Sequence, residues 1–315
     1  MGLLTWLRRP PAPAADAGAE LFDDEFQRKL DYLAVVSRRV FAGRTRAERR
    51  TKKSGSGVEF VDYREYTAGD DLRYLDWNLY QRHDRLLLRL FEEEEDLAIH
   101  LVVDASTSMG FGEGAKLRQA KRLAAALAYV GLSNLDRVSV AAARGDALEA
   151  IPPARGKQRI FPVFQFLRGL QPAGTTDLGA AMKSLVARSQ KRRGLAVLLS
   201  DLYDPAGFER GINALRFGRF EVVALHLVDP ADAKPQLYGD VRLYDCETGD
   251  ERDVTVTPRL LERYAEAYNG YRQEIEHFCA SKQVPYFAAD ASAPFDEIVL
   301  RVFRRGGFLR LEPCA

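Results

Sequence analysis

From Leu97 onward, short apolar runs alternate with amphipathic helical segments, and this alternation restricts the possible folds more than any other feature. It is typical of an α/β fold, in which a mostly parallel sheet is flanked by helices on both faces. The expected strands are LAIHLVV (97–103), VSVAAA (138–143), LAVLL (195–199), FEVVALHL (220–227) and VPYFA (284–288).

Apolar spacing also places helices along the chain. A first helix is expected from about Asp23 to about Val40, with Asp23 as its cap. Two later helices carry apolar stripes, which are Leu117, Ala120, Leu123, Ala124 and Leu127, and then Leu178, Ala181, Met182 and Leu185. A further helix should begin at Thr257-Pro258 and bury one face, consisting of Leu261, Tyr264, Tyr268, Tyr271, Ile275 and Phe278.

We expect three parts: a disordered tail (1–21), an N-terminal segment packed on the core (22–95), and the α/β domain (96–315). In the tail, 10–20 is a linker rich in alanine and proline, and the start of the chain lacks the pattern of a signal peptide. A small docking patch there is an open alternative, formed by Leu3, Leu4, Trp6 and Leu7. A β-hairpin inserted at about 230–256 should lie at the edge of the sheet.

Composition restricts the functional classes. The 46 lysine and arginine residues balance 45 aspartate and glutamate residues, so no overall field favours nucleic acid or a membrane surface. The basic stretch from Arg44 to Lys53 is expected to be a solvated loop, with a phosphate or nucleic-acid contact as the alternative. No run is long enough for a membrane span, and three scattered cysteines favour a reducing cytoplasm.

Polar residues that could hold a metal ion follow two of the expected strands. Asp104, Ser106 and Ser108 share one tight loop, and Asp201 ends a later strand. Thr176 stands where a helix begins. If the two strands are neighbours, these side chains meet at the carboxyl edge of the sheet, where open α/β sheets bind ligands. An oxygen-only set suits Mg²⁺, with Mn²⁺ or Ca²⁺ as alternatives.

Such an ion would keep an exchangeable position that an aspartate or glutamate of another protein can fill. We therefore expect a protein-binding module and not an enzyme. The alternative is a metal-dependent phosphoesterase or nuclease, which needs a general acid or base nearby. The four histidines are scattered without catalytic spacing, and the chain has no phosphate-binding loop motif.

The set Asp104, Ser106, Ser108, Thr176 and Asp201 resembles the metal-ion-dependent adhesion site of the von Willebrand factor A superfamily. Upstream, SGSGVEFVDYREYTAGDDLRYLDWNLYQR (54–82) resembles the signature of a bacterial family, domain of unknown function 58, as do the DCETGD turn and RRGGF at 304–308. The resemblance implies a six-stranded sheet ordered 3-2-1-4-5-6 with the two aspartate-bearing strands adjacent. It also implies a partnership with MoxR-type AAA+ ATPases in chaperone-like maturation of client proteins.

The upstream signature also has a structural interpretation. We expect its charged residues to form an ion-pair network that holds the N-terminal segment on the sheet, namely Arg64, Asp70, Asp71, Arg73, Asp76 and Arg82. Trp77 and Tyr80 are expected to bury their rings in the same junction, and 92–96 to form a solvated acidic face.

Overall fold

The computed structural model describes residues 21–41, 50–53, 59–94, 98–111, 114–189 and 194–305. The patch at the start of the tail, most of the basic stretch, the turn at 54–57 and most of RRGGF lie outside these described residues. The chain divides into two compact units. One contains the residues up to Ser37 together with those from Ala98 onward, and the other contains Arg38–Leu97.

The first unit is built on a six-stranded sheet in the order β11-β8-β7-β4-β5-β6. Its strands are β4 (Ala98–Asp104), β5 (Arg137–Arg144), β6 (Ala147–Ala154), β7 (Gly194–Ser200), β8 (Glu221–Val228) and β11 (Tyr286–Asp290). Neighbouring strands run parallel except β5 and β6. In chain order this is the expected 3-2-1-4-5-6 arrangement, so the predicted fold class and the adjacency of β4 and β7 are confirmed.

Strand β6 was not among the expected strands. Only Leu148 of its eight residues is buried, and it contains Pro152 and Pro153. Proline cannot donate a hydrogen bond to a ladder, so it is confined to edge strands and bulges. The composition of β6 therefore fits its place at the edge of the sheet, where it shows little of the apolar pattern that marks the other strands.

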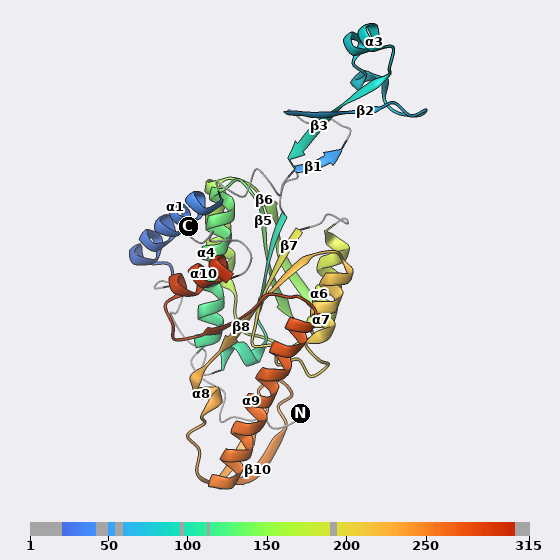
Figure 1. Cartoon of the computed structure of the whole chain (residues 1–315). Helices are drawn as coiled ribbons and strands as arrows, with labels where there is room; N and C mark the ends of the chain where they lie inside the picture. Colours follow the sequence, from blue (N-terminus) through green and yellow to red (C-terminus); the bar gives the residue numbers. More distant parts are fainter. Residues whose placement is uncertain are drawn as a thin grey trace, which may run out of the picture. The chain divides into compact units, whose positions relative to one another are not determined.

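Helices cover both faces of the sheet (Figure 1). One side carries α1 (Asp24–Phe41), α4 (Ala115–Ser133) and α10 (Phe295–Arg305), and the other carries α6 (Leu178–Arg188), α7 (Glu209–Phe217) and α9 (Pro258–Ser281). The expected stripes on α4 and α6 are buried throughout. On α9, Tyr268 and Ile275 are buried, whereas the other four residues of the expected face are only partly covered. Helices α5 (Ile160–Gly169), α7 and α10 were not anticipated.

Helix α1 docks on this unit through aromatic side chains. Phe22 stacks on Phe164 of α5 with ring centroids 4.5 Å apart, and Phe26 lies 4.5 Å from the ring of Phe295 on α10. As expected, Asp23 caps the helix, because its Oδ1 accepts a hydrogen bond of 2.7 Å from the Phe26 amide. Aromatic packing and the cap together fix where α1 begins.

The inserted hairpin consists of β9 (Gly239–Tyr244) and β10 (Glu251–Val256), which follow the short helix α8 (Pro230–Ala233). These strands form a separate two-stranded sheet, so the expected hairpin is present but is not paired with the described strands of the main sheet. In Figure 1 the hairpin and α8 lie beyond the end of the main sheet at which β8 finishes. The hairpin is therefore near the carboxyl ends of the parallel strands.

The second unit contains a three-stranded sheet, β1-β3-β2, made of Arg50–Lys53, Leu87–Glu94 and Glu59–Glu65 in that order. A 3-10 helix (Leu72–Tyr74) and α3 (Trp77–His83) lie between β2 and β3. Its charged residues form separate pairs, which are Arg64 with Asp70, Arg73 with Asp71, and Asp76 with Arg89. Arg89 was not in the expected network.

Trp77 and Tyr80 were expected to be buried, but within this unit their side chains remain exposed. Trp77 is 57% exposed and Tyr80 is 37% exposed. Their rings meet edge to face with centroids 6.2 Å apart. Both lie on α3, whose first turn is capped by Asp76 and presents these rings outward.

Candidate functional site

The loop after β4 brings the first three predicted residues together. Asp104, Ser106 and Ser108 are all buried. Oδ1 of Asp104 accepts a hydrogen bond of 2.9 Å from the amide of Ser106, and the hydroxyl oxygens of Ser106 and Ser108 are 3.0 Å apart. The loop tightens into a 3-10 helix (Thr107–Gly110) directly after Ser106. This turn places both hydroxyls on the same side as the carboxylate.

A second loop, before α6, is tied to the first by backbone hydrogen bonds. The Ala173 amide donates to the carbonyl of Ala105 at 2.8 Å, and the Thr107 amide donates to the carbonyl of Gly174 at 3.0 Å. Gly174 has φ +77°, which side chains with a Cβ rarely adopt. The chain then enters α6, capped by Asp177, so buried Thr176 lies beside the first loop.

The loop after β7 supplies Asp201, which is also buried. Because β4 and β7 are adjacent, Ser200 at the end of β7 donates a hydrogen bond of 2.6 Å to Oδ2 of Asp104. Asp204, farther along this loop, accepts a hydrogen bond of 2.9 Å from the Leu178 amide at the start of α6. All five predicted residues therefore lie on three interlinked loops at the carboxyl edge of the sheet.

Lys116, near the start of α4, is buried next to these loops. Its ammonium nitrogen is 2.8 Å from Oδ2 of Asp201 and 3.0 Å from Oδ2 of Asp232. Burial lowers the pKa of Lys116, but the two carboxylates outweigh this effect and raise its pKa overall, so the side chain is charged. One oxygen of Asp201 is thereby occupied by a cation.

Glu247, in the turn between β9 and β10, reaches the same site from outside the main sheet. Its Oε1 accepts a hydrogen bond of 2.8 Å from the hydroxyl of Thr176, and its Oε2 accepts one of 3.2 Å from the Thr176 amide. Glu247 thus hydrogen-bonds to one of the three predicted hydroxyl residues through both of its carboxylate oxygens.

The electrostatics of the site are dominated by buried negative charge. Burial, and then the nearby carboxylate of Asp201, raise the pKa of Asp104 well above its usual range. Burial also raises the pKa of Glu247, although the hydrogen bonds from Thr176 oppose this. The described hydrogen bonds of Asp104 come from neutral donors, the Ser106 amide and the Ser200 hydroxyl. Ionised carboxylates in this setting favour a bound cation.

Two histidines lie in the strands, as expected, and each is hydrogen-bonded to a neighbouring side chain there. His100 Nδ1 is 2.8 Å from the hydroxyl of Ser139, and His226 Nδ1 is 2.8 Å from the hydroxyl of Tyr286. Both rings are buried. Desolvation lowers the pKa of both residues. Their contacts are those of core residues.

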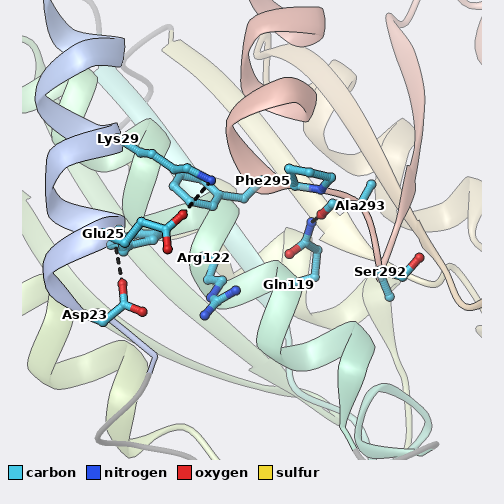
Figure 2. Close-up of a pocket in the computed structure, with 11 residues that line it drawn as sticks. Asp23, Glu25, Lys29, Gln119, Arg122, Ser292, Ala293 and Phe295 are labelled. Atoms are coloured by element: carbon cyan, nitrogen blue, oxygen red, sulfur yellow. Dashed lines mark hydrogen bonds and ion pairs between the residues drawn. The ribbon is translucent and has the colours of Figure 1, made fainter.

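A pocket of about 260 Å³ lies elsewhere, where α1, α4 and α10 meet (Figure 2). Lys29 bridges Glu25 at 3.2 Å and Asp296 at 3.4 Å there, and Gln119 donates a hydrogen bond to the Ala293 carbonyl at 2.7 Å. None of the five predicted site residues lines it. These contacts hold α1 on the core, and the pocket is part of that junction.

Sequence reasoning missed Lys116 and Glu247. Lys116 lies one turn from Ala120 on the buried face of α4, and a charged residue within an apolar stripe is a signal of a buried ion pair. Glu247 lies in a turn that was recognised, but its contact with Thr176 spans 71 positions in the chain. The sequence pattern offers no measure of that separation in space.

Among the described residues, no group of three or more histidine, cysteine, aspartate and glutamate side chains is arranged to hold a metal ion.

Several known proteins are similar to this chain. "Uncharacterized protein Rv1480" from Mycobacterium tuberculosis and "Uncharacterized protein Mb1516" from Mycobacterium bovis are each 32% identical over 226 residues, covering 70% of this chain and 71% of theirs. Among solved structures, an aerotolerance-related membrane protein from Bacteroides fragilis is 17% identical, with 68% of this chain and all of that chain covered and a TM-score of 0.40. Manganese-loaded TRAP protein from Plasmodium vivax is 15% identical, covering 66% and 72%, with a TM-score of 0.38.

A family match covers most of both units described above. Residues 62–274 match the family described as "Protein of unknown function DUF58". The match extends from β2 through the strands β4 to β8 of the main sheet, all three site loops and the hairpin into α9, and it ends before β11. The chain therefore belongs to the DUF58 family, and its sheet has the von Willebrand factor A-like strand order.

Proposed function

We propose that this chain is a protein-interaction module in which a divalent cation, held at the carboxyl edge of the sheet, binds a carboxylate of a partner protein. The observation that carries the proposal is the convergence of Asp104, Ser106, Ser108, Thr176 and Asp201 on three linked loops. These residues offer only oxygen donors, which suits Mg²⁺, Mn²⁺ or Ca²⁺.

The spacing of the hydroxyls supports this assignment. In an octahedral site with metal–oxygen distances of about 2.1 Å, neighbouring ligand oxygens are about 3.0 Å apart. The hydroxyl oxygens of Ser106 and Ser108 are 3.0 Å apart. The buried carboxylate of Asp104, whose described donors are neutral, would gain the opposite charge it lacks. The residues present therefore fit a hard cation.

The two aspartates have different roles in this proposal. Asp104 is held in place by the Ser106 amide and the Ser200 hydroxyl, and its remaining lone pairs would face the ion. One oxygen of Asp201 accepts from Lys116, so Asp201 would orient a water molecule on the ion. Neutral hydroxyls leave the ion with positive charge, which an incoming carboxylate can neutralise.

A binding role is favoured over a hydrolytic one by the surroundings of the site. His100 and His226, which lie in the strands, pair with Ser139 and Tyr286 in the core. Lys116 is held between two carboxylates and stays charged, so it is a poor general base.

None of the described helices is both long and apolar enough to cross a membrane.

For the partner, we propose a MoxR-type AAA+ ATPase or its client, bound through an acidic residue during maturation of the client in the cytoplasm. This part of the proposal rests on the family resemblance of the sequence. Fold alone does not identify a partner, so the experiment must capture one directly.

The test is calorimetric titration of the full chain with Mg²⁺ and Mn²⁺, alongside Asp104→Ala and a pull-down with either Mg²⁺ or chelator. We expect metal binding by the wild type, its loss in the variant, and retention of an AAA+ ATPase or client only with Mg²⁺. Glu221→Ala, an exposed residue at the opposite, amino end of β8, is the control and should bind metal normally. Equal binding by Asp104→Ala and wild type would refute the proposed site.

A further inference from the structure

The carboxylate of Glu247 stands against the hydroxyl face of the site. Its Oε1 is 2.8 Å from Thr176 Oγ1, and its Oε2 is 3.2 Å from the Thr176 amide nitrogen. The Thr176 hydroxyl is one of the groups beside which a partner's carboxylate would have to bind. The chain therefore already places a carboxylate of its own at that position.

The hairpin turn presents Glu247 in a fixed orientation. Oδ1 of Asp245 accepts hydrogen bonds from the amides of Glu247 and Thr248, at 2.8 Å and 3.1 Å. The Asp245 amide donates to the carbonyl of Asp250 at 2.9 Å and closes the turn. A turn with its own hydrogen bonds holds the glutamate side chain toward Thr176 without support from the main sheet.

Geometry relates this contact to the proposed ion. The 2.8 Å between Oε1 of Glu247 and Thr176 Oγ1 is close to the separation of about 3 Å expected for neighbouring oxygens on one octahedral ion. The two neutral donors of Thr176, its hydroxyl and its amide, leave the charge of a half-buried carboxylate uncompensated, which is unfavourable. A cation between Glu247 and the hydroxyls would remove that penalty.

We propose that Glu247 is an internal ligand of the site, occupying the coordination position that a partner's carboxylate takes, so that partner binding requires the hairpin turn to leave. This inference rests on the proposed function. The separate sheet of the hairpin makes such a movement feasible, because within the described part of the chain β9 and β10 pair only with each other. Releasing the turn breaks no hydrogen bond of the six-stranded ladder.

The experiment measures the hydration of bound Mn²⁺ from the relaxation rate of water protons, together with Mn²⁺ affinity by calorimetry. It uses the full-length wild type, Glu247→Ala and Glu247→Gln. Loss of the side-chain oxygens in Glu247→Ala should open one coordination position to water, so bound Mn²⁺ should gain one exchangeable water there, whereas the carbonyl oxygen of Glu247→Gln can still coordinate the ion and only the negative charge is lost. We expect Mn²⁺ affinity to fall roughly tenfold or more, because an anionic ligand is lost.

Acetate is the second probe, since it carries the same functional group without the tether. In Glu247→Ala it should bind the loaded Mn²⁺ and lower the water relaxation rate again, whereas wild type should not respond. Glu251→Gln, an exposed residue of the same hairpin, is the matched control and should behave as wild type. Glu247→Gln keeps the size of the side chain, so it tests the charge even if the alanine variant perturbs the turn.

The two proposals fail in different ways. If Mn²⁺ binds equally well to wild type and Asp104→Ala, the metal site itself is refuted. If Mn²⁺ requires Asp104 but has the same affinity in wild type and both Glu247 variants, and the same hydration in wild type and Glu247→Ala, the metal site stands and the internal ligand is refuted.

Discussion

The ammonium nitrogen of Lys116 lies 2.8 Å from Oδ2 of Asp201 and 3.0 Å from Oδ2 of Asp232, and all three residues are buried. The lysine thereby joins the start of α4 to the loop after β7 and to α8. This contact reduces the net negative charge next to the site, because Lys116 neutralises carboxylates that would otherwise repel Asp104 and Glu247.

Replacing Lys116 by methionine should destabilise the protein by about 3–5 kcal/mol, because two buried carboxylates lose their cation. Urea denaturation followed by circular dichroism measures the loss. Lys183→Met, on the exposed surface of α6, is the control and should change stability by less than about 0.5 kcal/mol. Equal stability of the two variants would show that the buried pair contributes nothing.

Tyr271→Phe tests how the loop bearing Asp201 is held. The Tyr271 hydroxyl donates to the carbonyl of Leu202 at 2.6 Å, and Leu202 has φ +60°, an unfavourable conformation for a branched side chain. Loss of this bond should cost about 1 kcal/mol and weaken Mn²⁺ binding several-fold. Tyr264→Phe removes a similar bond to the Asp232 carbonyl, at 2.7 Å, and should cost as much stability without weakening Mn²⁺ binding. Equal metal affinities in the two variants would contradict the role of Tyr271.

Gly110→Ala tests the contact between the first two loops. A Cβ at Gly110 would lie 2.5 Å from Cγ of Pro172, so the second loop would have to move. We expect a cost of about 1–3 kcal/mol, as for other overpacked sites, and weaker Mn²⁺ binding because Thr176 moves with the loop. Gly169→Ala is the control, since no atom lies within 4 Å of its added Cβ. Unchanged calorimetric titrations for Gly110→Ala would show that the loops move independently.

Asp76→Asn tests the acid stability of the second unit. The hydrogen bond from Arg89, with further ones from the amides of Leu79 and Asn78, lowers the pKa of Asp76 to about 2. The unfolded value is about 3.9, so the stabilisation is complete above about pH 4 and is lost as the pH falls toward 2. The variant should lack this part of the pH dependence in urea denaturation.

Trp77 fluorescence reports on this unit in a Trp6→Phe background, because the chain has two tryptophans. Asp62→Asn, an exposed aspartate of β2, is the control and should retain the wild-type pH dependence. Identical pH profiles for Asp76→Asn and wild type would exclude Asp76 as the titrating group.

Apolar periodicity was sufficient to predict the parallel strands and the buried stripes of α4 and α6, because both depend on local patterns. The positions of two proposed ligands could be inferred for the same reason, since Asp104 ends β4 and Asp201 directly follows β7. Because β4 and β7 are adjacent in the strand order, the two aspartates lie near each other. Strand β6 escaped prediction because most of its residues face solvent at an edge and two are prolines.

Residues whose role depends on distant contacts could not be predicted. Lys116 meets Asp201 across 85 positions of the chain, and Glu247 meets Thr176 across 71. Each pair is brought together by helix packing or by the direction in which the hairpin folds back. A single sequence contains no record of either.

Glu247 belongs to the same chain as Thr176, and this covalent connection determines which ligands could displace the hairpin turn. An internal group meets its site as if present at an effective concentration on the order of millimolar, set by the connecting chain. A dilute free carboxylate competes poorly against such a group, because it brings no further contacts. A protein partner can add surface around its acidic residue. On the proposal above, the hairpin would thus keep small carboxylate metabolites from binding at the site, and only a partner with a larger contact surface would displace Glu247.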